Sequence, residues 1–503
     1  MKHVFSLALF LLPAAPALPA AEPPLDQAAL RAHIAYLADD ALEGRKPGTE
    51  GGNKAALYVA RQFQAMGLQP GAAGQSWYQP VPLIERTPIS SSQIWHGQAG
   101  DFRLDRNDVL LLARDEAFDL NAAQVVFAGY GLDRSAQGFV DLKDVDVAGK
   151  VVLILSGRPD AARDAPGLEA RRAAIARAGA AAVIAIVGPS DPWELIRDQL
   201  GRGRAALATD LHAPLEGGIA FDAWTALARR AGRDGADLAA QAEKAGFRAV
   251  TLNLTADIVA RSGLRRFESV NVIGELPGKD HAREAVLFLA HWDHLGLCRP
   301  PGVPDRICNG AVDNASGVAL LIEAARRLAR GPSSRRSFYF VATTAEEIGL
   351  IGARVLAADP PVPRKRIVGA LNFDTVAIAP AGEPIAVIGR GRTALDPFID
   401  AAAHVQNRRI DDSEAANAFI TRQDGWELLK AGIPAVMPGG AFSDATRLAT
   451  FLAGDYHKPT DDLARPIPLD GVAEDGAFDV VLGRMLADPA TVPLPSAGPR
   501  RLP

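Results

Sequence analysis

Two hydrophobic patterns alternate along the C-terminal half of the chain. Short apolar runs at 286–290, 337–343 and 367–373 are separated by segments with helical spacing at 317–330 and 393–406. Short apolar runs predict buried strands, and a 3.6-residue period predicts helices. Alternation of this kind is typical of an α/β fold with a mostly parallel, mixed sheet and helices on both faces. We therefore predict an α/β domain in this region.

Two other regions have their own patterns. Residues 26–66 suit two helices, separated by a loop rich in glycine at 43–52. From about 125 to 260, apolar runs at 125–131, 151–155 and 180–187 surround an Ala/Arg-rich helix. No group of acids, bases or metal ligands recurs in this second region. We interpret it as a binding or gating module.

The first residues of the chain predict a signal peptide at 1–21. Lys2 supplies a positive start, residues 4–12 are apolar, and an Ala/Pro-rich stretch follows up to Glu22. A membrane anchor would need about 20 continuous apolar residues, and prolines interrupt this stretch early (Pro13, Pro16 and Pro19). With cleavage between Ala17 and Ala21, we expect a soluble periplasmic or secreted protein without a stable membrane anchor.

The composition limits the classes of protein, partner and metal site that the chain can represent. The 503 residues are 48% hydrophobic and 22% charged, which is typical of globular proteins and not of disordered ones. With 54 Lys and Arg against 59 Asp and Glu, and no basic block, we expect no nucleic-acid partner. The 2 cysteines are too few for a thiolate zinc site, so any metal must be held by histidine and carboxylate.

Histidine and carboxylate side chains follow the predicted strands. In open α/β sheets, ligands collect beyond the carboxyl ends of the strands. Two histidines and three carboxylates are too many for one tetrahedral zinc site with an open position. Two ions that share a bridging carboxylate, about 3.5–4 Å apart, would fit them. The candidate side chains lie at three strand ends and in two loops: His291, Asp293 and His294 after the first strand, Glu346 and Glu347 after the second, Asp374 after the third, and Asp313 and His457 in the loops.

The motifs around these residues resemble those of the dizinc exopeptidases related to bacterial leucyl aminopeptidase, aminopeptidase Y and glutamate carboxypeptidase. The shared motifs are His-x-Asp at 291–293, Asp-x-x-Ser-Gly at 313–317, Glu-Glu at 346–347 and the N-terminal stretch 40–49. The resemblance implies a zinc exopeptidase fold of the phosphorylase/hydrolase-like type. It also implies two Zn²⁺ ions, with Co²⁺ or Mn²⁺ as alternatives.

The resemblance also assigns roles to the residues. Asp313 would bridge the metals, His291 and Asp374 would bind one ion, and His457 and Glu347 would bind the other. Asp293 would orient His291 by accepting its second ring N–H, the usual arrangement around a metal ligand.

The same resemblance implies a catalytic domain divided by an inserted α+β protease-associated domain. The expected boundaries are 1–21 for the signal peptide, 22–120 and 261–490 for the two catalytic parts, 121–260 for the insertion and 491–503 for a disordered tail.

The chemistry of this set is hydrolytic. Two cations lower the pKa of a bridging water, which supplies hydroxide near neutral pH. Glu346, beside the ligand Glu347, is then free to act as general base and to pass the proton to the leaving amine. Tyr456 is a candidate donor to the developing oxyanion, with a packing role as the alternative.

Several residues have less defined roles. His294 would face the substrate or bond within its loop. Arg422 and Asp424 lie where relatives have an Arg-Ser-Asp-His-like segment, from which Gln423 and Gly425 depart. They are possible substrate contacts. Arg390 and Arg392 would bind a substrate carboxylate in a carboxypeptidase or lie on the solvated surface.

The two cysteines lie in one loop between His291 and Asp313. Export permits a disulfide, and we predict that Cys298 and Cys308 pair, with two free thiols as the alternative. Closing so short a loop stabilises by at most about 3 kcal/mol.

The resulting hypothesis is an exported zinc aminopeptidase that hydrolyses N-terminal residues from peptides. The alternatives are a carboxypeptidase or a glutaminyl-cyclase-like enzyme on the same fold, and a catalytically inactive binding protein. Retention of every ligand and of Glu346 argues against the last.

Overall fold

The computed structural model describes residues 18–162 and 165–494. The predicted signal peptide lies largely outside this range, and so does most of the predicted tail. The described residues form two compact units, one of 18–81 with 268–494 and the other of 82–267. The second unit thus begins at Pro82, whereas we expected an insertion from 121. The difference arises because the strands at 78–97 and 109–113 pair with strands near 204–219.

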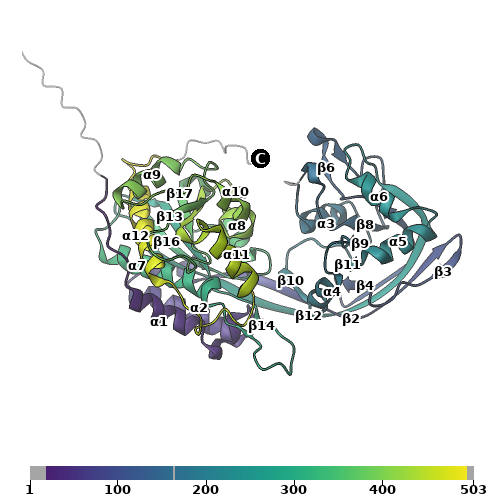
Figure 1. Ribbon diagram of the computed structural model, residues 1–503, viewed down its shortest axis with the longest axis horizontal. Coiled ribbons are helices and arrows are strands. Elements are labelled where there is room, and N and C mark those ends of the chain that lie inside the picture. The colour runs from purple at the N-terminus through teal and green to yellow at the C-terminus, as the bar shows by residue number, and fades with distance from the viewer. Residues whose placement is uncertain (1–17, 163–164, 495–503) are drawn as a thin grey trace, which may run out of the picture. The chain divides into compact units, whose positions relative to one another are not determined.

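The first unit contains a mixed sheet with the strand order β18-β19-β17-β13-β16-β12 (Figure 1). Strands β19, β17, β13 and β16 run parallel to their neighbours, whereas β18 and the end of β12 are antiparallel to theirs. The strands are β1 (Gln69–Pro70), β12 (Val250–Leu276, shared with the second unit), β13 (His281–His291), β14 (Gly296–Leu297), β15 (Ile307–Cys308), β16 (Arg336–Thr343), β17 (Ile367–Asn372), β18 (Ala386–Ile388) and β19 (Ala435–Gly439).

Helices cover both faces of this sheet, as the sequence predicted. The side chains of β13 alternate between the faces, since successive residues of a strand point in opposite directions. Phe288 belongs to a core that also contains buried residues of α1, α2, α7, α9 and α12, while Leu287 and Leu289 belong to a second core with residues of α8 and α10. The helices are α1 (Gln27–Leu37), α2 (Glu50–Ala65), α7 (Gly317–Arg330), α8 (Ile351–Ala358), α9 (Asp396–Val405), α10 (Gly425–Lys430), α11 (Ala445–Gly454) and α12 (Leu469–Leu486).

The second unit has its own sheet and its own core. Its strand order is β12-β5-β8-β9-β11-β4, with β5, β8, β9 and β11 parallel and β4 antiparallel at the edge. Trp224 stacks on Phe127 in its interior. The elements are β2 (Tyr78–Gly97), β3 (Gly100–Phe102), β4 (Val109–Ala113), β5 (Ala117–Phe127), β6 (Asp133–Arg134), β7 (Phe139–Val140), β8 (Val151–Leu155), α3 (Leu168–Arg177), β9 (Ala182–Ile186), α4 (Trp193–Gly201), β10 (Arg204–Leu207), β11 (Leu215–Ile219), α5 (Phe221–Arg230) and α6 (Gly235–Ala242).

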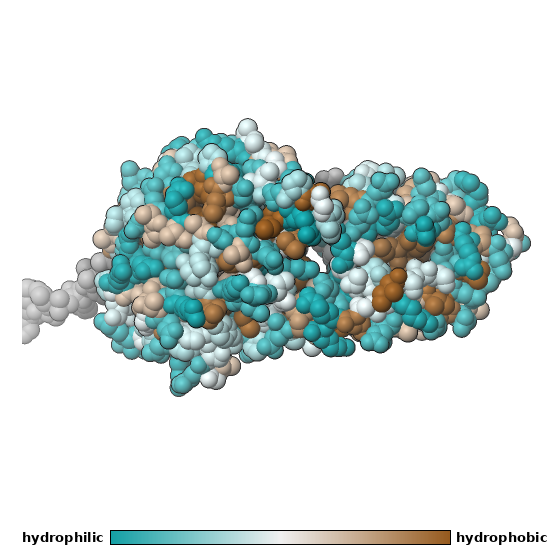
Figure 2. Space-filling view, turned by 90° about the horizontal axis from the view of Figure 1, so that it is seen from below, coloured by the Kyte–Doolittle hydropathy of each residue, from teal (hydrophilic) through white to brown (hydrophobic). Residues whose placement is uncertain are grey.

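The surface is largely polar. On the face drawn in Figure 2, hydrophobic residues form separate small patches among hydrophilic ones. Within the described ranges, no helix combines the length and the apolar character needed to cross a bilayer.

Candidate metal centre and active site

The carboxyl ends of three parallel strands place most of the predicted ligands. His291 is the last residue of β13 and pairs in register with Thr343, the last residue of β16. Asp374 follows β17 by two residues, and Glu346 and Glu347 follow β16 by three and four. Because these strands are parallel neighbours, their ends meet at one edge of the sheet.

Asp313 reaches the same edge from the segment before α7. This helix starts at Gly317, where a Cβ would lie 2.3 Å from the carbonyl oxygen of Phe373. Only glycine allows this close approach between the helix start and the segment after β17.

His291 faces two carboxylates through Nε2. This atom lies 3.4 Å from Oδ1 of Asp313 and 3.4 Å from Oδ1 of Asp374. On the other side of the ring, Nδ1 lies 3.1 Å from the main-chain oxygen of Asp293. Because a carbonyl oxygen only accepts, Nδ1 carries the hydrogen, and in the neutral ring Nε2 presents a lone pair to the carboxylates.

His457 forms the matching group on the other oxygen of Asp313. Its Nε2 lies 3.3 Å from Oδ2 of Asp313 and 3.0 Å from Oε2 of Glu347. The two histidines therefore approach opposite oxygens of one carboxylate, and each has a second carboxylate beside it. The structure brings all five predicted ligands together.

His294 is a further histidine in this cluster. Its side chain is fully buried, its Nδ1 lies 2.5 Å from Oε1 of Glu347, and its ring packs edge-on against His457 at 5.7 Å. His294, Asp313 and Glu347 also have ligand atoms within 4.8 Å of one another. The contact with Glu347 makes His294 part of the same cluster of candidate ligands, and His294 is not among the residues that line the pocket described below.

The donor set fits zinc. Nε2 of His291, His294 and His457 is buried without a hydrogen-bond partner among the described residues. Buried polar atoms are normally satisfied, so unpartnered imidazole nitrogens beside carboxylates indicate positions for a cation. Nitrogen and oxygen donors of this kind suit Zn²⁺.

The histidines and carboxylates of the cluster strongly shift one another's pKa values. Burial would raise the pKa of Asp313, but His291 and His457 outweigh it and hold that pKa well below its ordinary value. Burial would likewise lower the pKa of His457, yet Asp313 and Glu347 raise it to about 10. Such attraction between imidazole and carboxylate marks where a cation would take the place of protons.

Glu346 differs from these ligands. Burial raises its pKa well above the ordinary value, and the nearby charges of Asp374, Glu347 and Asp424 raise it further. Its Oε2 lies 4.0 Å from Nε2 of His291, and its side chain is 11% exposed. Glu346 also lines the pocket described below.

Asp293 and Asp424 occupy buried positions behind the ligands. The carboxylate of Asp293 lies 3.8 Å from Nδ1 of His291, farther than its own main-chain oxygen, and Oδ1 accepts a hydrogen bond from the N–H of Glu346. We expected this carboxylate to hold the ring N–H of His291, and the main-chain oxygen makes that contact instead. Asp424 is 1% exposed and accepts a hydrogen bond from the hydroxyl of Thr343, which places it away from a substrate.

A pocket of about 450 Å³ opens beside the ligands. Asp313, Glu346 and Asp374 line one part of it, together with Arg422, Tyr456, Thr375 and Gln423. The hydroxyl of Tyr456 lies 3.4 Å from Nη2 of Arg422, and its ring stacks on His457 at 3.7 Å. The remaining lining is apolar: Ile388, Phe419, Met437, Phe442, Leu448 and Leu452.

The cysteines are joined as expected. Cys298 and Cys308 form a disulfide with Cα atoms 5.7 Å apart. The bridge closes the loop that contains the paired strands β14 and β15, between His291 and Asp313.

Two residues that organise the site were not identified from the sequence. Arg45 is 1% exposed and donates hydrogen bonds to the main-chain oxygens of Trp292, Asn309, Gly310 and Leu37. Asp461 accepts from the N–H groups of Val312 and Asp313 at 3.0 Å each. Arg45 lies in the motif at 40–49 and Asp461 follows the candidate ligand His457 by four residues, but only the fold shows which main-chain groups they hold.

Comparison with known proteins now adds to this geometry. Residues 271–476 match the family model described as peptidase family M28. A search of curated protein sequences found no match.

Solved structures provide the other similarities. An aminopeptidase from Aneurinibacillus sp. strain AM-1 has a TM-score of 0.57 at 20% identity over 95% of this chain and 98% of its own. A zinc aminopeptidase from Bacillus subtilis has a TM-score of 0.46 at 20% identity over 92% and 95%. The first similarity shows a shared fold. Residues 271–476, which match that family model, include all five predicted ligands.

Proposed function

We propose that this protein is a zinc-dependent aminopeptidase with two metal ions in its active site. The observation that carries the proposal is the pair of histidines on opposite oxygens of Asp313, at 3.4 Å for His291 and 3.3 Å for His457. Asp374 and Glu347 complete the two groups. This arrangement supports two ions that share one bridging carboxylate.

Zinc ions held by these residues would polarise the scissile carbonyl and lower the pKa of a water molecule. Side chains of the protein would carry out the proton transfers. Glu346 borders the pocket beside His291 and is not needed as a ligand, so its carboxylate is placed to accept a proton from water. The same group then donates that proton to the leaving amine.

Tyr456 is the proposed donor to the carbonyl oxygen of the substrate. Burial and the nearby carboxylates raise the pKa of its hydroxyl above the ordinary value, so the group keeps its proton near neutral pH. Arg422 lies beside the same hydroxyl and its guanidinium lies 5.8 Å from the Tyr456 ring. A neutral phenol in this position donates to a developing negative charge.

The charges in the pocket favour an amino terminus over a carboxyl terminus. Three carboxylates line it, from Asp313, Glu346 and Asp374, and Arg422 is the one cation among the described lining residues. Arg390, a candidate for binding a substrate carboxylate, instead pairs with Asp400 at 2.9 Å. These positions support the aminopeptidase over the carboxypeptidase.

Export is part of the proposal. Glu22 is held to the first unit by Arg327 at 2.9 Å, Arg484 at 3.1 Å and Gln406, which bonds its N–H at 2.9 Å. Cleavage between Ala17 and Ala21 would leave this anchor intact. We further propose that the second unit is the protease-associated domain. Its residues would supply no catalytic group.

The decisive experiment compares aminoacyl chromogenic substrates with N-blocked peptides, with zinc measured on the same purified sample. We expect cleavage of substrates with free amino termini, no cleavage of blocked peptides, and about two zinc ions per active chain. Cleavage of blocked peptides alone would contradict the aminopeptidase. N-terminal sequencing of exported protein tests the cleavage site.

A further inference from the structure

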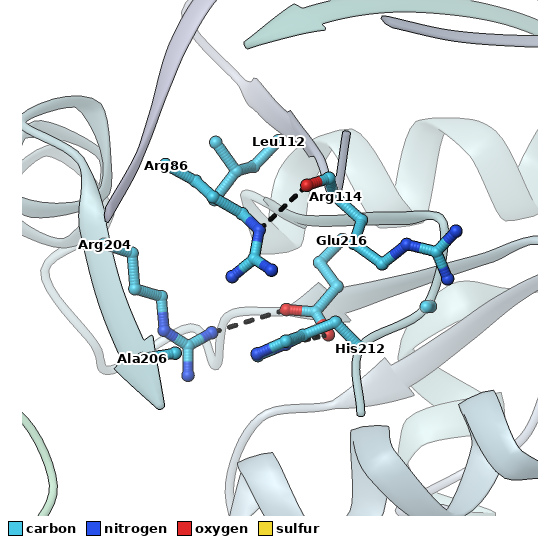
Figure 3. A pocket seen from close by; sticks show the side chains of 8 residues that line it. Arg86, Leu112, Arg114, Arg204, Ala206, His212 and Glu216 are labelled. Atoms are coloured by element: carbon cyan, nitrogen blue, oxygen red, sulfur yellow. Dashed lines mark hydrogen bonds and ion pairs between the residues drawn. The ribbon is translucent and has the colours of Figure 1, made fainter. Parts of the chain in front are cut away.

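A second pocket, of about 270 Å³, lies within the second unit and is lined by charged side chains (Figure 3). Arg86 comes from β2, Arg204 from β10 and Glu216 from β11, and His212 precedes β11. None of these residues belongs to the proposed metal centre.

Two arginines oppose each other across this pocket. Strands β10 and β2 are antiparallel, and their register places Arg204 directly opposite Arg86. Like charges at directly opposed positions destabilise a strand pair unless something between them compensates. The register therefore indicates a negative group at this position.

Arg86 forms no ion pair within the described part of the chain, although the charges of Glu216 and Asp115 attract it. Its side chain bonds through Nε to the main-chain oxygen of Arg114 at 2.9 Å, and the residue is 8% exposed. Neither Nη atom has a hydrogen bond or an ion pair within the part of the chain that the structure describes. Figure 3 shows both Nη atoms pointing into the pocket, toward the space between Arg204 and Glu216.

The glutamates nearby are already engaged by other cations. Glu216 lies 3.1 Å from Nδ1 of His212 and 3.5 Å from Nη1 of Arg204. Glu169 pairs with Arg204 and, at 3.2 Å, with Arg172. Glu216 and Glu169 are thus shared among Arg204, Arg172 and His212, and neither forms an ion pair with Arg86.

We propose that this pocket binds a carboxylate between Arg86 and Arg204. A guanidinium whose Nη atoms are both free presents two parallel N–H groups, which match the two oxygens of a carboxylate. The carboxylate would be that of a small organic acid or of a peptide C-terminus. The site is independent of the proposed peptidase activity.

Calorimetric titration of the full-length protein with acetate tests the site. We expect binding that Arg86→Met weakens by about tenfold or more, because the charge-assisted fork is lost. Arg261→Gln is the matched control, since its exposed guanidinium pairs with Asp119 at 3.2 Å and does not line this pocket. This control should bind acetate as the unmutated protein does.

Two further ligands distinguish the sources of the carboxylate. N-acetyl-dialanine should bind at the same site and its carboxamide should not. Tighter binding of the peptide acid than of acetate indicates a peptide terminus, and equal binding indicates a small acid. A thermal unfolding profile and circular dichroism spectrum of Arg86→Met that match those of the unmutated protein show that the variant is folded.

Acetate binding that is absent, or equal in Arg86→Met and the unmutated protein, would overturn the proposal. Should Arg86→Met fail to fold, a crystal structure of the unmutated protein with acetate decides. Density for acetate across both Nη atoms supports the site, and a lone water there rejects it.

Discussion

Glu346 lies with its Oε2 4.0 Å from Nε2 of His291, close to the metal-binding cluster but with its side chain on the wall of the pocket. Its sequence neighbour Glu347 instead contacts both His294 and His457. Adjacent glutamates thus point to different partners. Under the proposed function, this division would separate proton transfer from metal binding.

Glu346→Gln should therefore lower kcat by about 10²–10⁴-fold, the range for general acid–base catalysis, with zinc content unchanged. Glu347→Gln is the matched control, because the same chemical change there should reduce bound zinc. Steady-state kinetics and metal analysis on one preparation check both. Near-normal turnover in Glu346→Gln would exclude it as the base.

Asp313→Ala should weaken both metal positions, because its two oxygens face different histidines. Loss of a residue that only orients a metal ligand lowers metal affinity by about 10–100-fold. Because Asp313 is proposed to bind both ions directly, we expect its loss to lower the affinity by more than about 100-fold. In Asp374→Ala, the group around His457 and Glu347 remains, so one ion should stay bound. Two tightly held ions in Asp313→Ala would show that it is not the bridge.

Removal of metal by a chelator should lower Tm. A metal ion that binds only the folded site stabilises the folded state, and its removal withdraws this stabilisation. An ion present at 100 times its Kd stabilises by about 2.7 kcal/mol, which corresponds to several degrees in a domain of this size. Calorimetry before and after chelation, with zinc added back as control, measures the effect. An unchanged Tm after complete removal would contradict it.

The apolar side of the pocket should set the preference for the N-terminal residue. Leucyl substrates should exceed alanyl substrates in kcat/KM by about 10–200-fold, the discrimination that a hydrophobic pocket provides. Phe442 packs edge-on against Phe419 at 5.2 Å in this lining, so Phe442→Ala should lower the leucyl value far more than the alanyl value. Leu57→Ala, at an exposed position on α2, is the control. Equal effects on both substrates would place the side-chain pocket elsewhere.

The sequence predicted the ligands because each follows a strand or loop with a local motif. His291, Asp313 and Asp374 could be found in this way, and hydrophobic alternation predicted the strands that carry two of them. The apolar lining of the pocket could not be predicted from the sequence, since Ile388, Phe419 and Leu452 look like ordinary core residues until the fold brings them together.

The boundary of the second unit was missed for a related reason. Strand β4 pairs with β11, about 100 residues later, and no local pattern encodes a partner so distant. Arg86 and Arg204 are a similar case, because only the strand register reveals that they oppose each other.

Arg45→Met should destabilise the first unit through the loops that carry the ligands. Its guanidinium is buried, and burial lowers its pKa to about 10 despite attraction from Asp313 and Asp461, so it remains charged at neutral pH. The substitution leaves four main-chain oxygens without their donor, two of them in the segment just before Asp313. We expect the free energy of unfolding to fall by about 3–5 kcal/mol, with reduced zinc content. Denaturant unfolding measures the change, and Arg31→Met at an exposed position of α1 should stay within about 0.5 kcal/mol. A similarly small change in Arg45→Met would show that these loops hold their shape without the guanidinium.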